Sequence, residues 1–135
     1  MTGAELACAA AGLIGVPFRL HGRDPVHGLD CIGVLEAAMI RGGRAITLPT
    51  GYALRLSGID RWLPDPANLG FGTTDRPAQP GDVVLMQPGD AQFHLLIAGP
   101  DRGWVHAHAG LRRVVLTPCL PAGPVIGRWR LLPET

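Results

Sequence analysis

The spacing of apolar residues predicts that the first third of the chain is helical. Apolar residues recur every three to four positions over residues 3–14 and again over residues 31–41, which is the period of an amphipathic helix. The first run ends at Gly15 and the second at the pair Gly42-Gly43, where glycine favours a helix end. We therefore expect one helix over each run.

The second half of the chain alternates short apolar runs with turn sequences rich in glycine, proline and aspartate. Runs of this length between such turns favour strands over helices. The predicted strands cover residues 83–87, 92–98, 103–107, 111–117 and 125–131. The other segments are predicted as a loop over 17–29, a short helix near 50–57 and a proline-rich connector over 63–81. Helices followed by a meandering antiparallel sheet of about five strands indicate an α+β fold, with residues 1–135 as a single domain.

Composition excludes several classes of partner. The 135 residues are 47% hydrophobic and 17% charged, which supplies enough apolar material for one globular core. The net charge is +1 and the twelve basic residues, all arginine, are scattered, so we expect no nucleic-acid partner. No apolar run reaches the roughly 18 to 20 residues of a membrane span, so we expect no membrane partner.

Residue types that are rare or missing narrow the possible chemistry. The chain has no lysine, which excludes lysine Schiff-base chemistry and a Walker phosphate-binding loop. Its only serine, Ser57, lacks the first glycine of a nucleophile elbow. Nucleophilic catalysis would therefore use one of the three cysteines, Cys8, Cys31 or Cys119. Their odd number and the lack of a CxxC pair argue against a disulfide framework.

Cys31 is the best candidate for a nucleophile. It follows Asp30, a residue type that caps helices well, and would begin the helix over residues 31–41. The partial positive charge at a helix N-terminus favours thiolate over thiol. Cys8 and Cys119 are interpreted as packing residues. The alternative interpretation of Cys31 is likewise structural, a buried thiol without a catalytic role.

Two histidines on successive predicted strands supply a base and an orienting group. His94 lies within the apolar run over residues 92–98, where an imidazole has to be satisfied or used. His106 lies on the next strand, so the two rings could face one another across a hairpin. His108 points to the same side as His106 and is the alternative partner, while His94 could instead be a core histidine bonded to a backbone carbonyl. A cysteine at a helix start with a histidine and a second polar residue on neighbouring strands is the papain-type arrangement.

Four motifs, taken in order, resemble those of the NlpC/P60 family of papain-like cysteine peptidases. They are Gly15-Val16-Pro17-Phe18 through Gly22 to Asp30-Cys31-Ile32-Gly33-Val34, then Gly81-Asp82-Val83-Val84, His94-Leu95-Leu96-Ile97 and Val105-His106-Ala107. Each motif is weak alone, but their order and rough spacing match the family over residues 5–131. The resemblance implies a papain-like NlpC/P60 fold, with N-terminal helices packed on a C-terminal antiparallel sheet.

The resemblance also implies hydrolysis of an amide bond in peptidoglycan stem peptides, typically the bond after γ-D-glutamate, without a cofactor. Cys31 would be the nucleophile, His94 the general base and acid, and His106 the third residue that orients His94. The backbone N–H of Cys31 would help bind the oxyanion. The residues predicted to contact the peptidoglycan peptide or muropeptide substrate are Phe18, His21, Asp30 and Ile32.

The chain departs from the family's pattern around the predicted pocket. Phe18 stands where the family usually has a tyrosine, so a hydroxyl is missing there. His21 replaces the first glycine of the usual pair, Ile32 replaces a serine and Leu96 replaces a small residue. We expect these changes to reshape the pocket without touching the three catalytic positions. They leave open a second interpretation, a catalytically degenerate module that binds cell-wall fragments or a protein partner.

Metal binding is the rival chemistry for the same residues. Cys31, His94, His106 and His108 could in principle surround zinc, since all four are zinc donors. Because the chain contains neither HExxH nor CxxC, we predict no metal.

The N-terminus bears on location. It begins Met-Thr-Gly-Ala-Glu, with an acid where a signal peptide would carry basic residues. We therefore expect a cytoplasmic protein without a signal peptide, acting on recycled muropeptides or delivered to the cell wall by a phage-like particle.

Overall fold

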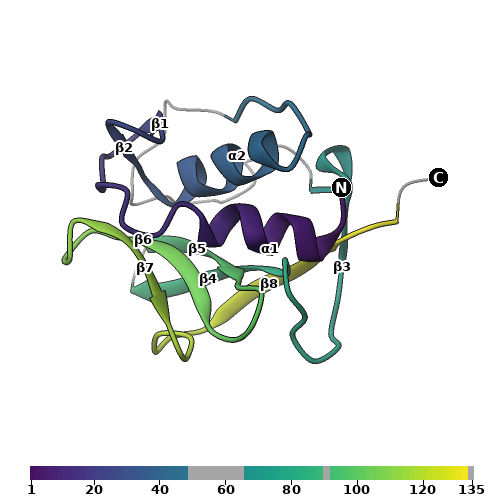
Figure 1. The fold of residues 1–135 in the computed structure, drawn as a ribbon. Helices are drawn as coiled ribbons and strands as arrows, with labels where there is room; N and C mark the ends of the chain where they lie inside the picture. Colours follow the sequence, from purple (N-terminus) through teal and green to yellow (C-terminus); the bar gives the residue numbers. More distant parts are fainter. Residues whose placement is uncertain (49–65, 90–91, 134–135) are drawn as a thin grey trace.

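The computed structural model describes residues 1–48, 66–89 and 92–133, and within them two helices lie over one face of a sheet (Figure 1). The helices are α1 (Gly3–Ala11) and α2 (Cys31–Arg41), with a 3-10 turn η2 (Pro66–Leu69). The strands are β1 (Arg23–Asp24), β2 (Gly28–Leu29), β3 (Phe71–Thr73), β4 (Val83–Gly89), β5 (Gln92–Ala98), β6 (Trp104–His108), β7 (Arg113–Thr117) and β8 (Val125–Leu131). The helix predicted near residues 50–57 lies outside the described residues. No helix in the described ranges is long and apolar enough to cross a membrane.

Helix α1 begins at a capping box and ends earlier than predicted. The Thr2 hydroxyl accepts a hydrogen bond from the Glu5 N–H at 3.1 Å, and the Glu5 carboxylate accepts one from the Thr2 N–H at 3.0 Å. The helix stops at Ala11 because Gly12 caps it and residues 12–15 form turns. The apolar spacing continues past the helix into these turns, which is why the sequence overestimated its length.

Helix α2 has the predicted bounds. The Asp30 side chain caps it by accepting a hydrogen bond from the Gly33 N–H at 2.8 Å, and Gly42 closes its other end. Nine of its eleven residues are buried, because it packs against α1 on one side and over β5 and β6 on another. This central position brings the first residue of α2 to the sheet.

In the part of the chain that the structure describes, the sheet has six antiparallel strands in the order β3-β8-β4-β5-β6-β7. Strands β4 to β7 are sequential neighbours, and β8 returns to pair between β3 and β4. The α+β prediction is confirmed, with one strand more than expected. The additional strand, β3, lies in the predicted connector, and its three residues are too few to show an alternating pattern.

A small hairpin of β1 and β2 lies within residues 17–29, which were predicted to be loop. Asp24 pairs with Gly28, and the Asp24 carboxylate accepts a hydrogen bond from the Val26 N–H at 2.8 Å. Two residues per strand carry no readable period, so this hairpin was not predictable from apolar spacing.

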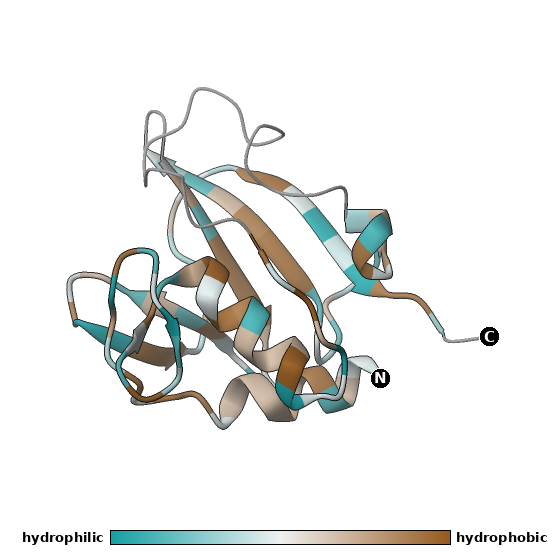
Figure 2. Cartoon of the chain, turned by 90° about the horizontal axis from the view of Figure 1, so that it is seen from above, coloured by the Kyte–Doolittle hydropathy of each residue, from teal (hydrophilic) through white to brown (hydrophobic). Residues whose placement is uncertain are grey.

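Successive residues of the central strands divide between two apolar clusters. The face toward the helices forms the main core together with α1 and α2. The residues that the six-stranded sheet contributes to this core are Phe71, Val83, Leu85, Leu95, Ile97, Val105, Ala107, Val114 and Leu131. The opposite face carries a smaller cluster of Val84, Met86 and Leu96, against which Trp104 and Leu120 pack. Burial on both faces explains why the central strands are hydrophobic along much of their length (Figure 2).

The Gly81-Asp82 pair ties the start of β4 to α1 and β8. Gly81 has a φ of +87°, and a Cβ added to it would clash with the Gly3 carbonyl oxygen. The fully buried Asp82 carboxylate accepts hydrogen bonds from the Arg130 guanidinium at 2.8 and 2.9 Å, and this contact raises the pKa of Arg130. The Gly-Asp motif therefore has a structural role where the chain enters β4, away from the pocket described below.

Replacing Gly81 with alanine should cost more stability than the same change at Gly43. Both glycines have positive φ, +87° and +98°, but a Cβ added to Gly43 would have no atom of the described residues within 4 Å apart from those of its chain neighbours. Gly43→Ala should cost about 1–2 kcal/mol from backbone strain alone. Gly81→Ala should cost about 1–3 kcal/mol more because of the steric clash. Urea unfolding of the two variants measures the difference, and equal losses would contradict the close packing of Gly81 on α1.

Candidate active site

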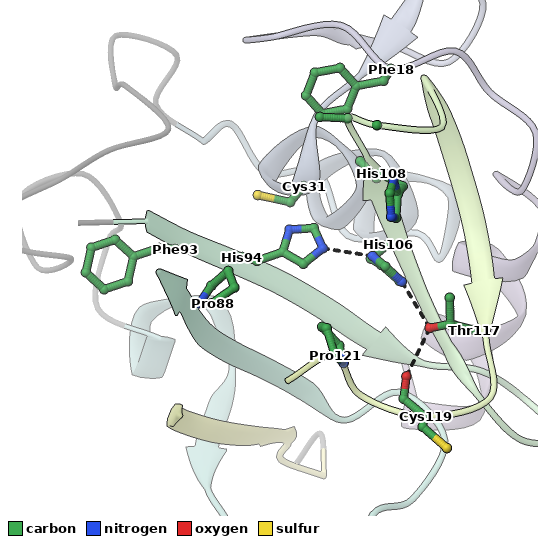
Figure 3. A pocket seen from close by; sticks show the side chains of 13 residues that line it. Phe18, Cys31, Pro88, Phe93, His94, His106, His108, Thr117, Cys119 and Pro121 are labelled. Atoms are coloured by element: carbon green, nitrogen blue, oxygen red, sulfur yellow. Dashed lines mark hydrogen bonds between the residues drawn. The ribbon is translucent and has the colours of Figure 1, made fainter. Parts of the chain in front are cut away.

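A pocket opens where β5 and β6 separate, beside the first residue of α2. The two strands pair only through Ile97↔Val105 and Ala98↔Trp104 in the described residues, which leaves space between them near the start of β5. The pocket has a volume of about 510 Å³, within the usual range for small-ligand sites. Its polar and thiol side chains are Cys31, His94, His106, His108, Thr117 and Cys119, and its larger apolar ones are Phe18, Pro88, Phe93 and Pro121 (Figure 3).

The Asp30 carboxylate holds Cys31 at the start of α2. Asp30 is fully buried, and Cys31 is 5% exposed. Besides the Gly33 N–H, the carboxylate accepts hydrogen bonds from the His21 N–H and from the Arg23 guanidinium, each at 2.8 Å. The loop before α2 and the first turn of the helix are thus fastened to one buried anion.

Burial raises the pKa of the Cys31 thiol to about 12. The neighbouring Asp30 carboxylate raises it further, while the backbone N–H groups of Leu95 and Ile32 and the Arg23 cation act in the opposite direction. The Ile32 N–H at the helix start acts in the predicted direction, but it does not determine the net shift, because the pKa of the thiol lies above its ordinary value. Lost hydration and the adjacent carboxylate outweigh the partial charge of the helix, so Cys31 is a neutral thiol near pH 7.

His94 from β5 and His106 from β6 meet across the gap between their strands. His94 Nε2 lies 2.8 Å from His106 Nδ1, with the ring centroids 4.9 Å apart in an edge-to-face arrangement. The prediction that the two imidazoles face one another is confirmed, and the core-carbonyl alternative for His94 is not what the structure shows. In Figure 3 the His94 ring lies between Cys31 and His106.

Both imidazoles are neutral at neutral pH. Burial lowers the pKa of His94 to about 4, and the nearby rings of His106 and His108 lower it as well. Burial also lowers the pKa of His106 to about 4, followed by the effect of His108. The resting site therefore holds a neutral thiol beside a neutral imidazole, not a thiolate–imidazolium pair.

The thiol and the imidazole are neighbours without a mutual hydrogen bond in the described structure. His94 Nε2 is occupied by His106, so Nδ1 is the His94 nitrogen left for the thiol of Cys31. Catalytic hydrogen bonds are often long or absent in substrate-free sites and shorten when substrate binds.

Thr117 is a pocket residue that the sequence analysis missed. Its Oγ1 lies 3.0 Å from His106 Nε2, and its hydroxyl donates a hydrogen bond to the backbone carbonyl of Cys119 at 3.2 Å (Figure 3). Thr117 pairs with Trp104, two residues before His106, so β7 presents the hydroxyl on the same face as the imidazole. The alternation of side chains along β7 indicates the face on which Thr117 lies, but no sequence motif marks this residue as functional.

The four residues predicted to contact substrate lie in different environments. Phe18 is half-buried and lines the pocket. Asp30 is committed to the cap and Ile32 is fully buried in the main core, so the predicted contact of these two side chains with substrate is corrected. His21 is exposed and outside the lining of this pocket, and its contact with substrate stays a prediction. Its φ of +60° is the left-handed conformation that favours glycine, consistent with the glycine expected there.

Three further predictions about individual side chains need correction. Leu96 is fully buried in the smaller cluster and does not shape the pocket. Cys8 and Cys119 are exposed instead of packed, and Cys119 lines the pocket. All three thiols are free.

His108 lines the pocket but is not the partner of His94. Its Nδ1 accepts a hydrogen bond from the Leu111 N–H at 3.0 Å, and its ring centroid lies 6.0 Å from that of His106. Among the described residues, no group of three or more His, Cys, Asp or Glu side chains is placed to hold a metal ion.

Two substitutions around Cys31 should shift its pKa in opposite directions. Asp30→Asn removes a nearby negative charge and keeps a cap oxygen, so the pKa should fall. Arg23→Gln removes a nearby cation, so the pKa should rise. Because thiolate is the reactive form, iodoacetamide should label Cys31 faster in the first variant and slower in the second than in wild type, at any fixed pH between about 7 and 10. Peptide mass spectrometry reads the labelling at Cys31 separately from Cys8 and Cys119.

These two variants control for one another. Both break the same ion pair and loosen the same loop, so a purely mechanical effect would accelerate labelling in both. Acceleration in both would contradict the electrostatic account of the Cys31 pKa.

Comparison with known proteins identifies the fold. No family model and no curated protein matches the chain. Among solved structures, the NlpC/P60 domain of the peptidoglycan hydrolase SagA is similar at 23% identity and a TM-score of 0.58, covering 87% of this chain and 90% of that one. The P60 domain of antigen MAP1204 from M. avium subspecies paratuberculosis is similar at 20% identity and a TM-score of 0.60, covering 98% of this chain and 96% of that one. The peptidoglycan hydrolase RipB from Mycobacterium tuberculosis is similar at 22% identity and a TM-score of 0.60, covering 98% of this chain and 65% of that one. At these identities the likeness concerns the fold, and this chain has the fold of NlpC/P60 domains.

Proposed function

We propose that this protein is a cysteine peptidase of the NlpC/P60 type that hydrolyses an amide bond in peptidoglycan stem peptides. The observation that carries the proposal is the hydrogen-bonded pair of neutral imidazoles, His94 and His106, beside the thiol of Cys31 in one pocket. Two of the similar solved structures are named as peptidoglycan hydrolases, which supports the substrate class. The proposed bond joins γ-D-glutamate to the following diamino acid.

The reaction begins as the Cys31 sulfur attacks the amide carbon while its proton moves to His94 Nδ1. A C–S bond forms and the electron pair of the C=O bond moves onto oxygen. His94 then gives the proton to the departing nitrogen, the C–N bond breaks and an acyl thioester remains on Cys31. A water molecule deprotonated by His94 hydrolyses the thioester and restores the thiol.

The resting protonation states determine when the proton moves. Because the pKa of Cys31 is raised and that of His94 lowered, the proton stays on sulfur until the attack itself. As His94 becomes an imidazolium, its Nε2–H donates to His106 Nδ1, which stabilises the cation and holds the ring in place. His106 is thus the orienting third group of the triad.

The start of α2 supplies a donor for the developing oxyanion. The first N–H groups of a helix have no carbonyl partner within the helix, and the N–H of Cys31 is the first in α2. A backbone donor beside the nucleophile is well placed to stabilise negative charge on the former carbonyl oxygen.

A second candidate function is a module that binds cell-wall fragments or a protein partner without cleaving them. The raised pKa of Cys31 and the lack of a Cys31–His94 hydrogen bond in the described structure favour it. Phe18, which lines the pocket without a hydroxyl, is also consistent with binding alone.

Cleavage of defined muropeptides separates the two functions. Wild type should release the diamino-acid fragment, whereas Cys31→Ala should abolish release because it removes the nucleophile. The matched control is Cys8→Ala, since Cys8 is exposed and outside the pocket, and it should cleave like wild type. Mass spectrometry identifies the products.

The same assay discriminates the remaining alternatives. Equal cleavage by wild type and Cys31→Ala would contradict the catalytic assignment, and binding without cleavage by wild type would favour the binding module. The two settings proposed from the sequence, recycling in the cytoplasm and delivery to the wall by a phage-like particle, differ in substrate. Preference for soluble muropeptides supports the first, and efficient cleavage of intact sacculi supports the second.

A further inference from the structure

We propose that Thr117 is a positioning residue that, through His106, keeps the proton of His94 on Nε2 and leaves Nδ1 free to act as the base. This inference rests on the proposed peptidase function, in which Nδ1 of His94 receives the thiol proton. A continuous row of hydrogen bonds carries it, from the Cys119 carbonyl through Thr117 and His106 to His94 (Figure 3).

The Cys119 carbonyl sets the direction of this row. A carbonyl oxygen can only accept, so the Thr117 hydroxyl donates to it, at 3.2 Å. The single proton of the hydroxyl is then committed. Toward His106 Nε2, 3.0 Å away, the Thr117 oxygen can only accept, so His106 carries its proton on Nε2.

The tautomer of His106 determines which nitrogen of His94 carries the proton. A neutral imidazole has one proton, so a His106 ring protonated on Nε2 presents a lone pair on Nδ1. His94 Nε2, at 2.8 Å from this atom, must then be the donor. With its own single proton on Nε2, neutral His94 keeps its lone pair on Nδ1. Burial, which lowers the pKa of both rings, keeps them in the neutral form that this reasoning requires.

The reversed row has one hydrogen bond fewer. If the Thr117 hydroxyl donated to His106 Nε2, the Cys119 carbonyl would lose this donor, and His106 would carry its proton on Nδ1. His94 Nε2 would then have to accept, which places the His94 proton on Nδ1. In that tautomer His94 cannot take the proton of the thiol.

The described groups near His94 other than His106 and Thr117 do not fix the position of its ring proton. His108 has its Nδ1 bonded to the Leu111 N–H and makes only a tilted ring contact with His106. Cys31, from α2, makes no hydrogen bond to either ring within the described residues. Thr117 is the polar group bonded to the far nitrogen of His106, and its hydroxyl acts on His94 only through that ring.

Nitrogen NMR of histidine-labelled protein reads the tautomers directly, because protonated and unprotonated ring nitrogens have different shifts. In the wild-type protein near neutral pH, His94 and His106 should both be protonated on Nε2. In Thr117→Val, which keeps the side-chain shape, His106 loses its acceptor, and His94 should shift partly or wholly to the Nδ1–H form. Thr117→Ser should restore the wild-type spectrum. His94 protonated on Nδ1 in wild type would overturn the proposal, whether or not the valine variant folds, and so would an unchanged His94 tautomer in Thr117→Val.

Turnover of muropeptides gives the second readout. Thr117→Val should lower kcat/KM by at least about tenfold, short of the roughly 10⁴-fold loss seen when a catalytic histidine is held in the wrong tautomer. Thr117→Ser should stay close to wild type. The control is Thr73→Val, the same chemical change on the exposed end of β3, which should have no effect. Wild-type kcat/KM in Thr117→Val would overturn the proposal.

Failure of this inference is distinguishable from failure of the proposed function. If wild type cleaves no muropeptide, the proposed function fails, and the NMR spectra still decide whether Thr117 sets the tautomers. If wild type cleaves and Thr117→Val keeps the wild-type tautomers, only the role of Thr117 is lost.

Discussion

The buried carboxylate of Asp30 is the contact on which the arrangement of the site depends. It caps α2 through the Gly33 N–H, holds the preceding loop through the His21 N–H and is compensated by the Arg23 guanidinium. A buried charge is costly unless it is paired and fully hydrogen-bonded, so cap, loop and ion pair depend on one another. Cys31 is the next residue in the chain, and its sulfur reaches the pocket because these contacts fix where α2 begins.

The contact that positions the thiol also keeps it unreactive at rest. Burial and the Asp30 charge raise the pKa of Cys31, while burial of His94 lowers the pKa of the base. A neutral thiol reacts slowly with oxidants and alkylating agents, since the thiolate is the nucleophile. In the proposed mechanism, the reactivity of Cys31 then depends on bound substrate and on His106 and Thr117, which stabilise and orient His94. The contacts of the folded protein position the neutral thiol and imidazole, and in the proposed reaction these groups become charged only during the attack.

Local signals made much of this predictable from the sequence. The cap and the apolar period gave α2 its bounds, and two histidines on neighbouring apolar runs led to the His94–His106 contact that the structure contains. What failed depends on the environment in three dimensions. The pKa of Cys31 follows from burial, which helix position alone does not reveal. Thr117 contacts the Cys119 carbonyl two residues further on and the His106 ring on the neighbouring strand, and no sequence motif marks this arrangement. The two- and three-residue strands have no readable period.

The central claim is that Cys31 attacks the substrate and carries its acyl group, and intact-protein mass spectrometry tests this most directly. A muropeptide with a thioester in place of the scissile amide makes acylation fast, so that hydrolysis of the intermediate limits turnover. Acid quenching during turnover should then show protein heavier by the acyl group, with the added mass on the peptide that contains Cys31. Turnover of this substrate with an unmodified Cys31, or with the acyl group on another residue, would contradict the account.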